Sequence, residues 1–519
     1  MPFTSQPVQA QSLIGYNWAG PGKIGNAPAH QSLLNLRRRY CTVAMVTSRK
    51  LRAFKNWMKS QHVECSDALD LVVTTNSSVR ALCDLNVGDL VATIPKESCL
   101  TVKTSGARQM IEESELEGIL ALAVVIMYER SLGPLSPWFG YLQSLPYSEP
   151  IPLLWSLSEI DSLLAGTELH KIVKDDRALI YEDWKECIEP LILTSVSLQL
   201  RAENFGVEEY LASKSLIASR SFEIDDYYGC GMVPLADLFN HKTGAEDVHF
   251  TSSYSELNTS DSELDDDVHT DKHGNDDNEP TQVYSRGSGD DLTVLEMIMV
   301  KKVEAGAEVF NTYGSLGNAA LLHRYGFAEP DNHYDIVNLD LDLVLQWSSS
   351  QFSHRYTRRR LSLWRKLDYS GCVSQNSEYF EISFDGEPQI ELLVLLYIIL
   401  LPEQVFAQLD LQVSITSGFE KSEGFHFESS NSMLLTDGVC AALSGLADIR
   451  ESLYGSTCLE DDIKTFNCCC LVKEPKKYYS LVLRISERRI LEKLRCYASA
   501  SAIMQTKDGG KTRKRSKFE

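Results

Sequence analysis

A tyrosine near the end of a predicted strand and an Asn-His pair are the first side chains here whose type and position suit chemistry. Tyr313 follows the strand-like residues 308–310 and precedes Gly314, where a side chain can emerge from a strand end into a cleft. Asn240-His241 has the composition of a turn. Taken alone, these residues also fit a half-buried tyrosine with a satisfied hydroxyl and a hydrogen-bonded core histidine. The surrounding motifs must decide between these interpretations.

The thirteen cysteines form neither a disulfide pattern nor a metal-binding pattern. No Cys-x-x-Cys occurs, and the consecutive Cys468-Cys469-Cys470 cannot wrap one tetrahedral metal ion. No cleavable secretory segment opens the chain. We therefore expect a reduced, intracellular protein without structural zinc.

Length and charge limit the class of protein. With 519 residues, 43% of them hydrophobic and 24% charged, the sequence is long enough for two or three globular domains. Its formal net charge of -22 argues against a general nucleic-acid coat protein but suits an enzyme with a basic substrate. The longest apolar run, residues 392–401, is shorter than the roughly 20 residues that span a bilayer. We expect a monomer that binds neither nucleic acid directly nor a membrane.

Three segments have compositions typical of chain outside a folded core. Residues 1–48 lack Asp and Glu and combine Lys and Arg with Ser, Ala, Gln and Asn, as organelle transit peptides do. Residues 251–291 are rich in Asp, Ser, Asn and Gly, which predicts an acidic, disordered surface loop. Residues 501–519 form a basic tail.

Two of these segments give conflicting predictions of location. Residues 37–44 (RRRYCTVA) resemble the processing region of plastid presequences, although a tail without an address has the same composition. Residues 511–517 (KTRKRSK) fit a nuclear signal, although a short basic tail is more often merely solvated. We favour the chloroplast because the acid-free stretch is the longer signal, with the nucleus or cytoplasm as the alternative.

The rest of the chain alternates between strand-like and helical stretches. Helical periodicity predicts helices near residues 49–61, through 111–214, and at 390–401 and 481–497. Short β-branched stretches predict strands at residues 69–75, 79–84, 90–95, 248–250 and 292–300. Residues 86–89 (NVGD) predict a hairpin turn before the third strand, and the last two strands flank the acidic loop.

Four motifs in a fixed order carry a family resemblance. They are Ser219-Arg220-Ser221-Phe222, residues 232–241 (MVPLADLFNH), residues 306–318 (GAEVFNTYGSLGN) and Tyr325-Gly326-Phe327. Together they resemble the SET-domain protein methyltransferases of the branch related to the Rubisco large-subunit lysine methyltransferase. The resemblance covers roughly residues 50–500.

The resemblance implies an α+β fold. A β-rich SET domain would span residues 49–330, with a helical insert at about 110–215 and the acidic loop at 251–291. A C-terminal α-helical substrate-binding domain would follow at 345–500.

The implied reaction is methylation of a protein lysine with S-adenosylmethionine as cofactor. Methyl transfer from a sulfonium is an in-line displacement, so the protein must mainly align the reacting atoms and hold a neutral amine. A dry, narrow channel beside the positive charge of the cofactor disfavours the ammonium form of lysine, whose ordinary pKa is about 10.4. No metal ion is needed.

The resemblance assigns roles to the motif residues. The Tyr313 hydroxyl would orient the target amine and the transferred methyl group, which makes Tyr313 the catalytic residue. Asn240 and His241 would contact the adenine side of the cofactor. Arg220 would reach the cofactor carboxylate while its backbone carbonyl faces the target amine. The remaining substrate contacts would come from Phe222, the Asp237 carbonyl and the aromatic walls Tyr325 and Phe327, although an aromatic pair around a glycine is more often core packing.

The N-terminal cofactor motif departs from the family pattern. The family usually has Arg-Gly-Leu, whereas this chain has Arg80-Ala81-Leu82. Glycine allows close backbone approach and positive φ, so Ala81 keeps the cofactor contact only if its φ is negative.

Two alternatives follow from the same residues. In a related branch that methylates protein histidine, an asparagine matches Phe222 and a tryptophan matches Ala236, and Phe222 offers the imidazole no hydrogen bond. The other alternative is a degenerate SET protein that binds a partner without methyl transfer. Ala81 and the acidic loop motivate this second alternative.

Overall fold

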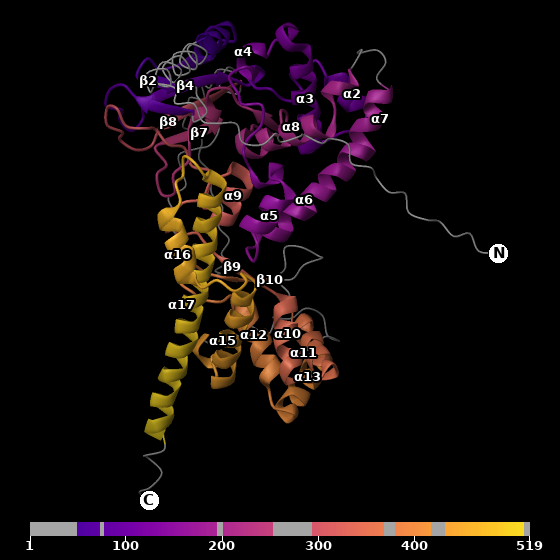
Figure 1. Cartoon of the computed structure of the whole chain (residues 1–519), viewed down its shortest axis with the longest axis vertical. Helices are drawn as coiled ribbons and strands as arrows, with labels where there is room; N and C mark the ends of the chain where they lie inside the picture. Colours follow the sequence, from indigo (N-terminus) through magenta and orange to yellow (C-terminus); the bar gives the residue numbers. More distant parts are fainter. Residues whose placement is uncertain are drawn as a thin grey trace, which may run out of the picture. The chain divides into compact units, whose positions relative to one another are not determined.

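The computed structural model (Figure 1) describes most of the chain between residues 49 and 512. The described ranges are 49–72, 77–194, 201–252, 293–367, 379–416 and 431–512. The predicted transit segment 1–48, nearly all of the acidic loop and the last part of the basic tail lie outside them. Internal contacts divide the chain into two units, Met1–Lys50 and Leu51–Glu519. The elements below belong to the second unit, apart from the first two residues of the helix at 49–60.

A four-stranded antiparallel sheet forms the β-rich part. Its order is β1 (Glu64–Cys65), β4 (Leu90–Pro95), β8 (Val294–Met299) and β7 (Val248–Ser252). Buried and half-buried residues alternate along β8, as expected for a strand with one face on the core. The predicted strands on both sides of the acidic loop are therefore confirmed, and they are direct neighbours.

Two smaller strand pairs flank this sheet. They are β2 (Leu69–Val72) with β3 (Ser78–Ala81), and β5 (Ser221–Glu223) with β6 (Cys230–Met232). The helix predicted near 49–61 covers residues 49–60. Its Phe54, Trp57 and Met58 are buried in the main core, as its periodicity predicts.

The predicted hairpin at residues 86–89 is wrong, because the strands on its two sides do not pair with each other. β3 pairs with β2, whereas β4 pairs with β1 and β8. The turn itself forms, and the Asp89 backbone N–H donates to the Asn86 carbonyl at 3.1 Å. Leu85 instead forms a bridge to Val303, which lies far along the chain.

The helical insert is present where the periodicity predicts it. Its helices are α2 (Arg108–Glu113), α3 (Gly118–Leu132), α4 (Phe139–Leu142), α5 (Leu157–Leu163), α6 (Leu169–Asp183), α7 (Glu189–Thr194) and α8 (Val207–Arg220). A π-helical segment, Trp184–Ile188, joins α6 to α7. The insert therefore delivers Arg220 to the start of β5.

The insert contains one stretch that meets the length and composition of a membrane span, although none was expected from the sequence. The stretch Gly118–Leu135, which contains α3, is long and apolar enough by length and composition to cross a membrane. Half of this stretch is buried inside the protein, and core helices pass the same test, so it is a weak indication. Within α3 the buried Glu129 carboxylate accepts hydrogen bonds from Ser105 and Ser136 at 2.7 and 2.6 Å.

Beyond Gly317 the chain is mainly helical. After α9 (Asn318–Tyr325) come α10 (Leu341–Gln351), α11 (His354–Lys366), α12 (Ile390–Leu400), α13 (Glu403–Thr416), α14 (Asn431–Leu434), α15 (Asp437–Ser452), α16 (Leu459–Cys468) and α17 (Pro475–Thr512). A strand pair that the sequence did not suggest, β9 (Val337–Asp340) with β10 (Tyr379–Ile382), lies among them. The last helix enters the segment expected as a basic tail and ends at Thr512.

Two large apolar cores accompany this organisation. One is formed by buried residues between Phe54 and Val309, and the other by buried residues between Val337 and Ala498. A small third cluster joins insert residues such as Trp155 and Leu169 to Leu322 of α9 and Leu483 of α17. The proposed domain boundary between 330 and 345 remains a prediction, and the two cores support it.

The pairing of β7 with β8 predicts that the acidic loop can be shortened. Ser252 lies opposite Leu295 in an antiparallel pair, so a short linker can join the two strand ends. Replacing residues 255–289 with a short Gly-Ser linker should leave the melting temperature nearly unchanged, since loop length alters closure entropy by only about 0.6 kcal/mol per doubling. Differential scanning fluorimetry tests this, and a clear loss of melting temperature would show that the segment contributes to the folded core.

Candidate active site

The segment 306–313 is paired on both of its sides, and this pairing brings the predicted site residues together. On one side the Ala81 N–H donates to the Ala307 carbonyl at 2.9 Å, and the Gly306 N–H donates to the Ala81 carbonyl at 2.7 Å. Arg80 forms an antiparallel bridge with Glu308. The predicted N-terminal cofactor motif therefore lies along this segment.

On its other side the same segment pairs with residues 240–248. The Asn311 N–H donates to the Asn240 carbonyl at 2.8 Å, and His241 forms a parallel bridge with Asn311. The Asn240 amide nitrogen also donates to the Glu308 carboxylate at 2.7 Å and to the Ser77 carbonyl at 2.9 Å. Asn240 thus ties together three stretches that are distant in the sequence.

Tyr313 lies at the end of this paired segment. Its backbone N–H donates to Nδ1 of His241 at 3.0 Å, and its hydroxyl donates to the Phe239 carbonyl at 3.2 Å. Burial raises the pKa of the Tyr313 hydroxyl, while the Arg220 guanidinium acts in the opposite direction. The hydroxyl is therefore protonated at neutral pH and can act as a hydrogen-bond donor.

Tyr313 is one of four aromatic rings that form a closed cluster. Its ring stacks on Tyr325, with centroids 4.3 Å apart, and on His241, with centroids 5.0 Å apart. Phe327 completes the cluster through tilted contacts with His241 and Tyr325, each at 6.3 Å. The structure thus brings together the predicted catalytic tyrosine, one predicted cofactor contact and both predicted channel walls.

His241 is held as a neutral ring. Burial lowers its pKa, although nearby Glu329 acts to raise it. Because Nδ1 accepts the Tyr313 N–H, the proton belongs on Nε2, which lies 3.3 Å from the Thr243 hydroxyl. Both ring nitrogens are thus engaged inside the protein, which argues against a general base here, as the sequence analysis expects.

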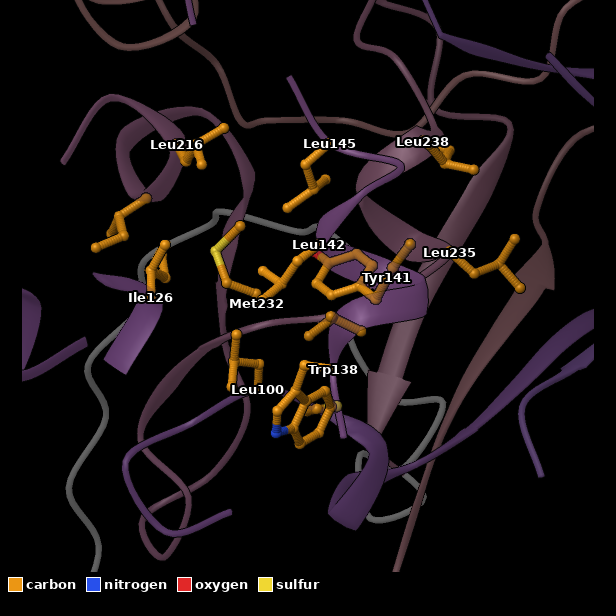
Figure 2. Packing of buried hydrophobic residues seen from close by; sticks show 14 of the residues in the cluster. Leu100, Ile126, Trp138, Tyr141, Leu142, Leu145, Leu216, Met232, Leu235 and Leu238 are labelled. Carbon is orange, nitrogen blue, oxygen red and sulfur yellow. The ribbon is translucent and has the colours of Figure 1, made fainter. Parts of the chain in front are cut away.

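The turn that carries the Phe239 carbonyl is strained. Leu235 has φ of 77° and ψ of −48°, a conformation that costs a residue with a Cβ about 1–3 kcal/mol. It leads into the short 3-10 helix Ala236–Leu238. Figure 2 shows Leu235 with Tyr141 and Met232 among buried apolar side chains, and this packing holds the turn in place.

A buried charge cluster adjoins this turn. Nη1 of Arg220 donates to the Asp237 carbonyl at 2.8 Å, and Nε donates to the Glu149 carboxylate at 2.6 Å. The Tyr141 hydroxyl donates to Oδ2 of Asp237 at 2.9 Å, while Oδ1 of Asp237 is buried without a hydrogen-bond partner. Burial raises the pKa of Asp237 to about 6, against the opposing effect of Arg220.

Comparisons with known proteins fit this geometry. The chain is 25% identical to ribosomal lysine N-methyltransferase 3 of Saccharomyces cerevisiae over 327 residues, which are 51% of this chain and 59% of that protein. It is 25% identical to N-lysine methyltransferase setd6 of Xenopus laevis over 363 residues, 66% of this chain and 70% of that protein. The alignment with the yeast protein thus spans about three fifths of that relative's length. No family model matches the sequence.

Solved structures extend the likeness over nearly the whole chain. The SET domain of LSMT bound to lysine and AdoHcy superposes with a TM-score of 0.60 and 18% identity, covering 87% of this chain and 91% of that chain. The chain has the fold of this LSMT structure. Rubisco LSMT bound to AdoMet gives a TM-score of 0.58 at 18% identity, over 88% of this chain and 92% of that one.

The departure at Ala81 is structurally tolerated in this SET-type fold. Ala81 is not among the described residues with positive φ, and its side chain is 1% exposed in the main core. Its backbone N–H and carbonyl are both paired with the 306–307 segment. Neighbouring Arg80 and Leu82 have exposed side chains.

Phe222 lies next to the charge cluster but packs elsewhere. It is in β5, two residues after Arg220, and its ring contacts Phe250 of β7 with centroids 5.0 Å apart. Its predicted contact with substrate stays a prediction.

Two members of the charge cluster, Glu149 and Tyr141, escaped the sequence analysis. Glu149 lies between Ser148 and Pro150 in a stretch without periodicity, and Tyr141 lies in the four-residue helix α4. A buried arginine needs carboxylate partners, and this was the only signal that pointed to Glu149. Sequence spacing does not show which acidic residue supplies the carboxylate.

The unpartnered Oδ1 of Asp237 allows a nearly isosteric test. In Asp237→Asn the amide can replace Oδ1 while the remaining oxygen still accepts from Tyr141. Because the folded-state pKa of Asp237 is raised to about 6, the folded parent binds more protons than the unfolded chain between about pH 4 and 6. The free energy of unfolding of the parent, relative to the variant, should therefore fall by up to about 3 kcal/mol as pH rises through this window.

Urea unfolding at several pH values measures this difference. Asp226→Asn, which changes an exposed carboxylate in the turn between β5 and β6, is the matched control and should show no such trend. A difference between the parent and Asp237→Asn that does not change with pH would contradict the raised pKa.

Proposed function

We propose that this protein methylates a lysine side chain in a protein substrate, with S-adenosylmethionine as cofactor. The observation that carries the proposal is the Tyr313 hydroxyl, which donates to the Phe239 carbonyl where the segment 306–313 crosses between its two partners. The names of the yeast and Xenopus relatives, and the lysine, AdoHcy and AdoMet in the superposed structures, support it.

The residues present fit the cofactor. Nη2 of Arg220 has no hydrogen-bond partner among the described residues, so it is available for a carboxylate. The exposed Arg80 guanidinium offers a second cation beside the same segment. Asn240, His241 and residues 80–82 would hold the adenine and ribose side through groups other than the His241 ring nitrogens and the Ala81 backbone N–H and carbonyl, which are already paired. When bound, the cofactor supplies a methyl group activated by a sulfonium.

The protein's own residues contribute in two ways: they orient the target amine and they exclude water from it. The Tyr313 hydroxyl donates its one proton to the Phe239 carbonyl, so its oxygen lone pairs and the second lone pair of that carbonyl can accept the N–H groups of a target amine and align it. The rings of Tyr325, stacked on Tyr313, and of Phe327, tilted against Tyr325, would exclude water, which favours the neutral amine over the ammonium ion. In this proposal Tyr313 is the catalytic residue, and the Arg220 and Asp237 carbonyls line the amine end of the channel.

We assign substrate binding to the C-terminal helices at 345–500. This region has its own apolar core, separate from that of the SET-type part at 49–330. The described residues contain no group of three or more His, Cys, Asp or Glu side chains arranged to hold a metal ion. The proposed chemistry needs none.

Histidine methylation is the second enzymatic candidate, and two observations disfavour it. The side chain of Phe222 has no polar atom, and it packs on Phe250. Ala236 is fully buried in the main core, where the histidine-modifying branch has a tryptophan. A binding module without activity is less well supported, because Ala81 causes no positive-φ strain.

Removing one hydroxyl tests the catalytic assignment. Tyr313→Phe should keep the stacking on Tyr325 and His241 and the binding of S-adenosylmethionine. It should lower the rate of methyl transfer by about 100-fold or more, as loss of one preorganised donor does in other enzymes. Transfer of labelled methyl groups to a cell extract, followed by mass spectrometry, gives the rate and the substrate.

Tyr334→Phe is the matched control, because Tyr334 is 45% exposed. It should transfer at the parental rate. Parental activity of Tyr313→Phe would remove Tyr313 from the catalytic role, whereas loss of cofactor binding in calorimetry would assign it a structural role instead.

We also propose the chloroplast as the location, on the composition of residues 1–48. A C-terminal fluorescent fusion should enter plastids only when residues 1–47 are present, and the mature protein should begin near residues 41–47. Nuclear fluorescence that survives this deletion and disappears on removal of residues 511–517 would favour the alternative.

A further inference from the structure

Helix α11 concentrates positive charge in a strongly acidic protein. Its sequence, HRYTRRRLSLWRK, contains five arginines and one lysine and no Asp or Glu, whereas the whole chain has a formal net charge of -22. Such a local excess of one sign attracts oppositely charged partners even when the rest of the surface repels them.

Two of these arginines serve the fold. Arg360 is fully buried, with its guanidinium 3.5 Å from the ring centroid of Tyr356 and 4.2 Å from that of Phe406. It donates to the Leu401 carbonyl at 2.8 Å. Arg359 and Arg360 both pair with the Glu403 carboxylate, at 2.9 and 3.2 Å. The single Glu403 carboxylate therefore offsets one of these two positive charges.

The other cations occupy the solvent-facing side of the helix. Arg355, Arg358, Arg365 and Lys366 are exposed, at spacings that place them on one face. Among the described residues Arg355 and Arg358 have no acidic partner. The Lys366 ammonium lies 3.6 Å from the carboxylate of Asp410. Arg355 and Arg358 thus carry the uncompensated charge on this face among the described residues.

This face is hollowed. Arg358, Leu361, Ser362, Arg365 and Lys366 line a depression of about 330 Å³. Arg365 also lines a larger cavity of about 750 Å³ between α6 and the β9–α10 region. That cavity is also lined by Glu168, Asp175, Asp340 and Asp342, so the mainly basic surface is confined to the depression on α11.

We propose that the basic face of α11 docks an acidic segment of the protein substrate, away from the methylated lysine. The inference rests on the proposed function and names the substrate class: proteins with a run of Asp or Glu near the target. The hollow contains the Leu361 side chain and the Ser362 hydroxyl between its cations, which suits peptide side chains better than a uniform phosphate backbone.

A single-stranded nucleic acid fits this face less well. Bases bind proteins largely by stacking on exposed aromatic rings. On α11 Trp364 is buried, and Tyr356 is covered by Phe352 and by the Arg360 guanidinium. The large negative charge of the protein also opposes a long polyanion more than a short acidic peptide.

Fluorescence anisotropy with a fluorescein-labelled Glu-rich decapeptide tests the docking without any methyl transfer. The full chain should bind the peptide at low salt, and the affinity should fall as salt screens the charges. Arg355→Glu with Arg358→Glu should weaken binding about tenfold or more, because two attractive contacts become repulsive. Arg52→Glu, which reverses an exposed arginine on the helix at 49–60, is the matched control and should bind as the parent does.

Both reversed arginines are exposed and have no acidic partner among the described residues, so the melting temperature of the double variant should match that of the parent. Equal binding by this variant and the parent would overturn the proposal. So would tighter binding of an oligouridylate probe through the same arginines.

The kinetic readout separates docking from catalysis. For a lysine peptide with an acidic flank, the double variant should raise KM about tenfold and leave kcat unchanged. Failure of the decapeptide to bind, with lysine transfer intact, removes the docking surface and leaves the proposed function standing. Peptide binding in a protein without any transfer contradicts the proposed function and confines α11 to a binding role.

Discussion

The double pairing of residues 306–313 is the constraint on which the site depends. The segment exchanges hydrogen bonds with residues 79–81 on one side and with residues 240–248 on the other, so it cannot shift along one partner without breaking register with the second. Tyr313 and His241 owe their contact to this register. Since a β-strand alternates its side chains between two faces, a slip of one residue would turn Tyr313 away from the Phe239 carbonyl.

Buried charge is the second organising feature, and it acts on the same turn. Arg220 lies between the carboxylates of Glu149 and Asp237, and its guanidinium also holds the Asp237 carbonyl. Burying three ionisable groups is costly unless they are paired and hydrogen-bonded. This desolvation cost occurs beside Leu235, whose positive φ is also unfavourable. Strained backbone of this kind clusters at functional sites, which fits a turn that carries site residues.

Much of this architecture follows from local sequence, and the rest depends on long-range pairing. Periodicity predicts the helix with Phe54 and Trp57, the helical insert and the strands around the acidic loop. The hairpin predicted at residues 86–89 is wrong, because turn composition does not show that Leu85 pairs with Val303. The motifs place Tyr313 beside His241, but Glu149 carries no local signal, since a buried ion pair is specified by the fold that encloses it.

The position of α17 has a consequence for the order in which the molecule is assembled during translation. Lys476 on this helix pairs with Glu159 of α5, 317 residues earlier, and Ser486 donates to the buried Asp335 carboxylate, which also binds the start of α9. Leu483 completes an apolar cluster whose other members have already left the ribosome. The insert therefore cannot bury this cluster completely until α17 has been synthesised, and the apolar side chains of the cluster stay partly exposed to water until then. This makes the nascent chain dependent on its last segment and exposed to chaperones.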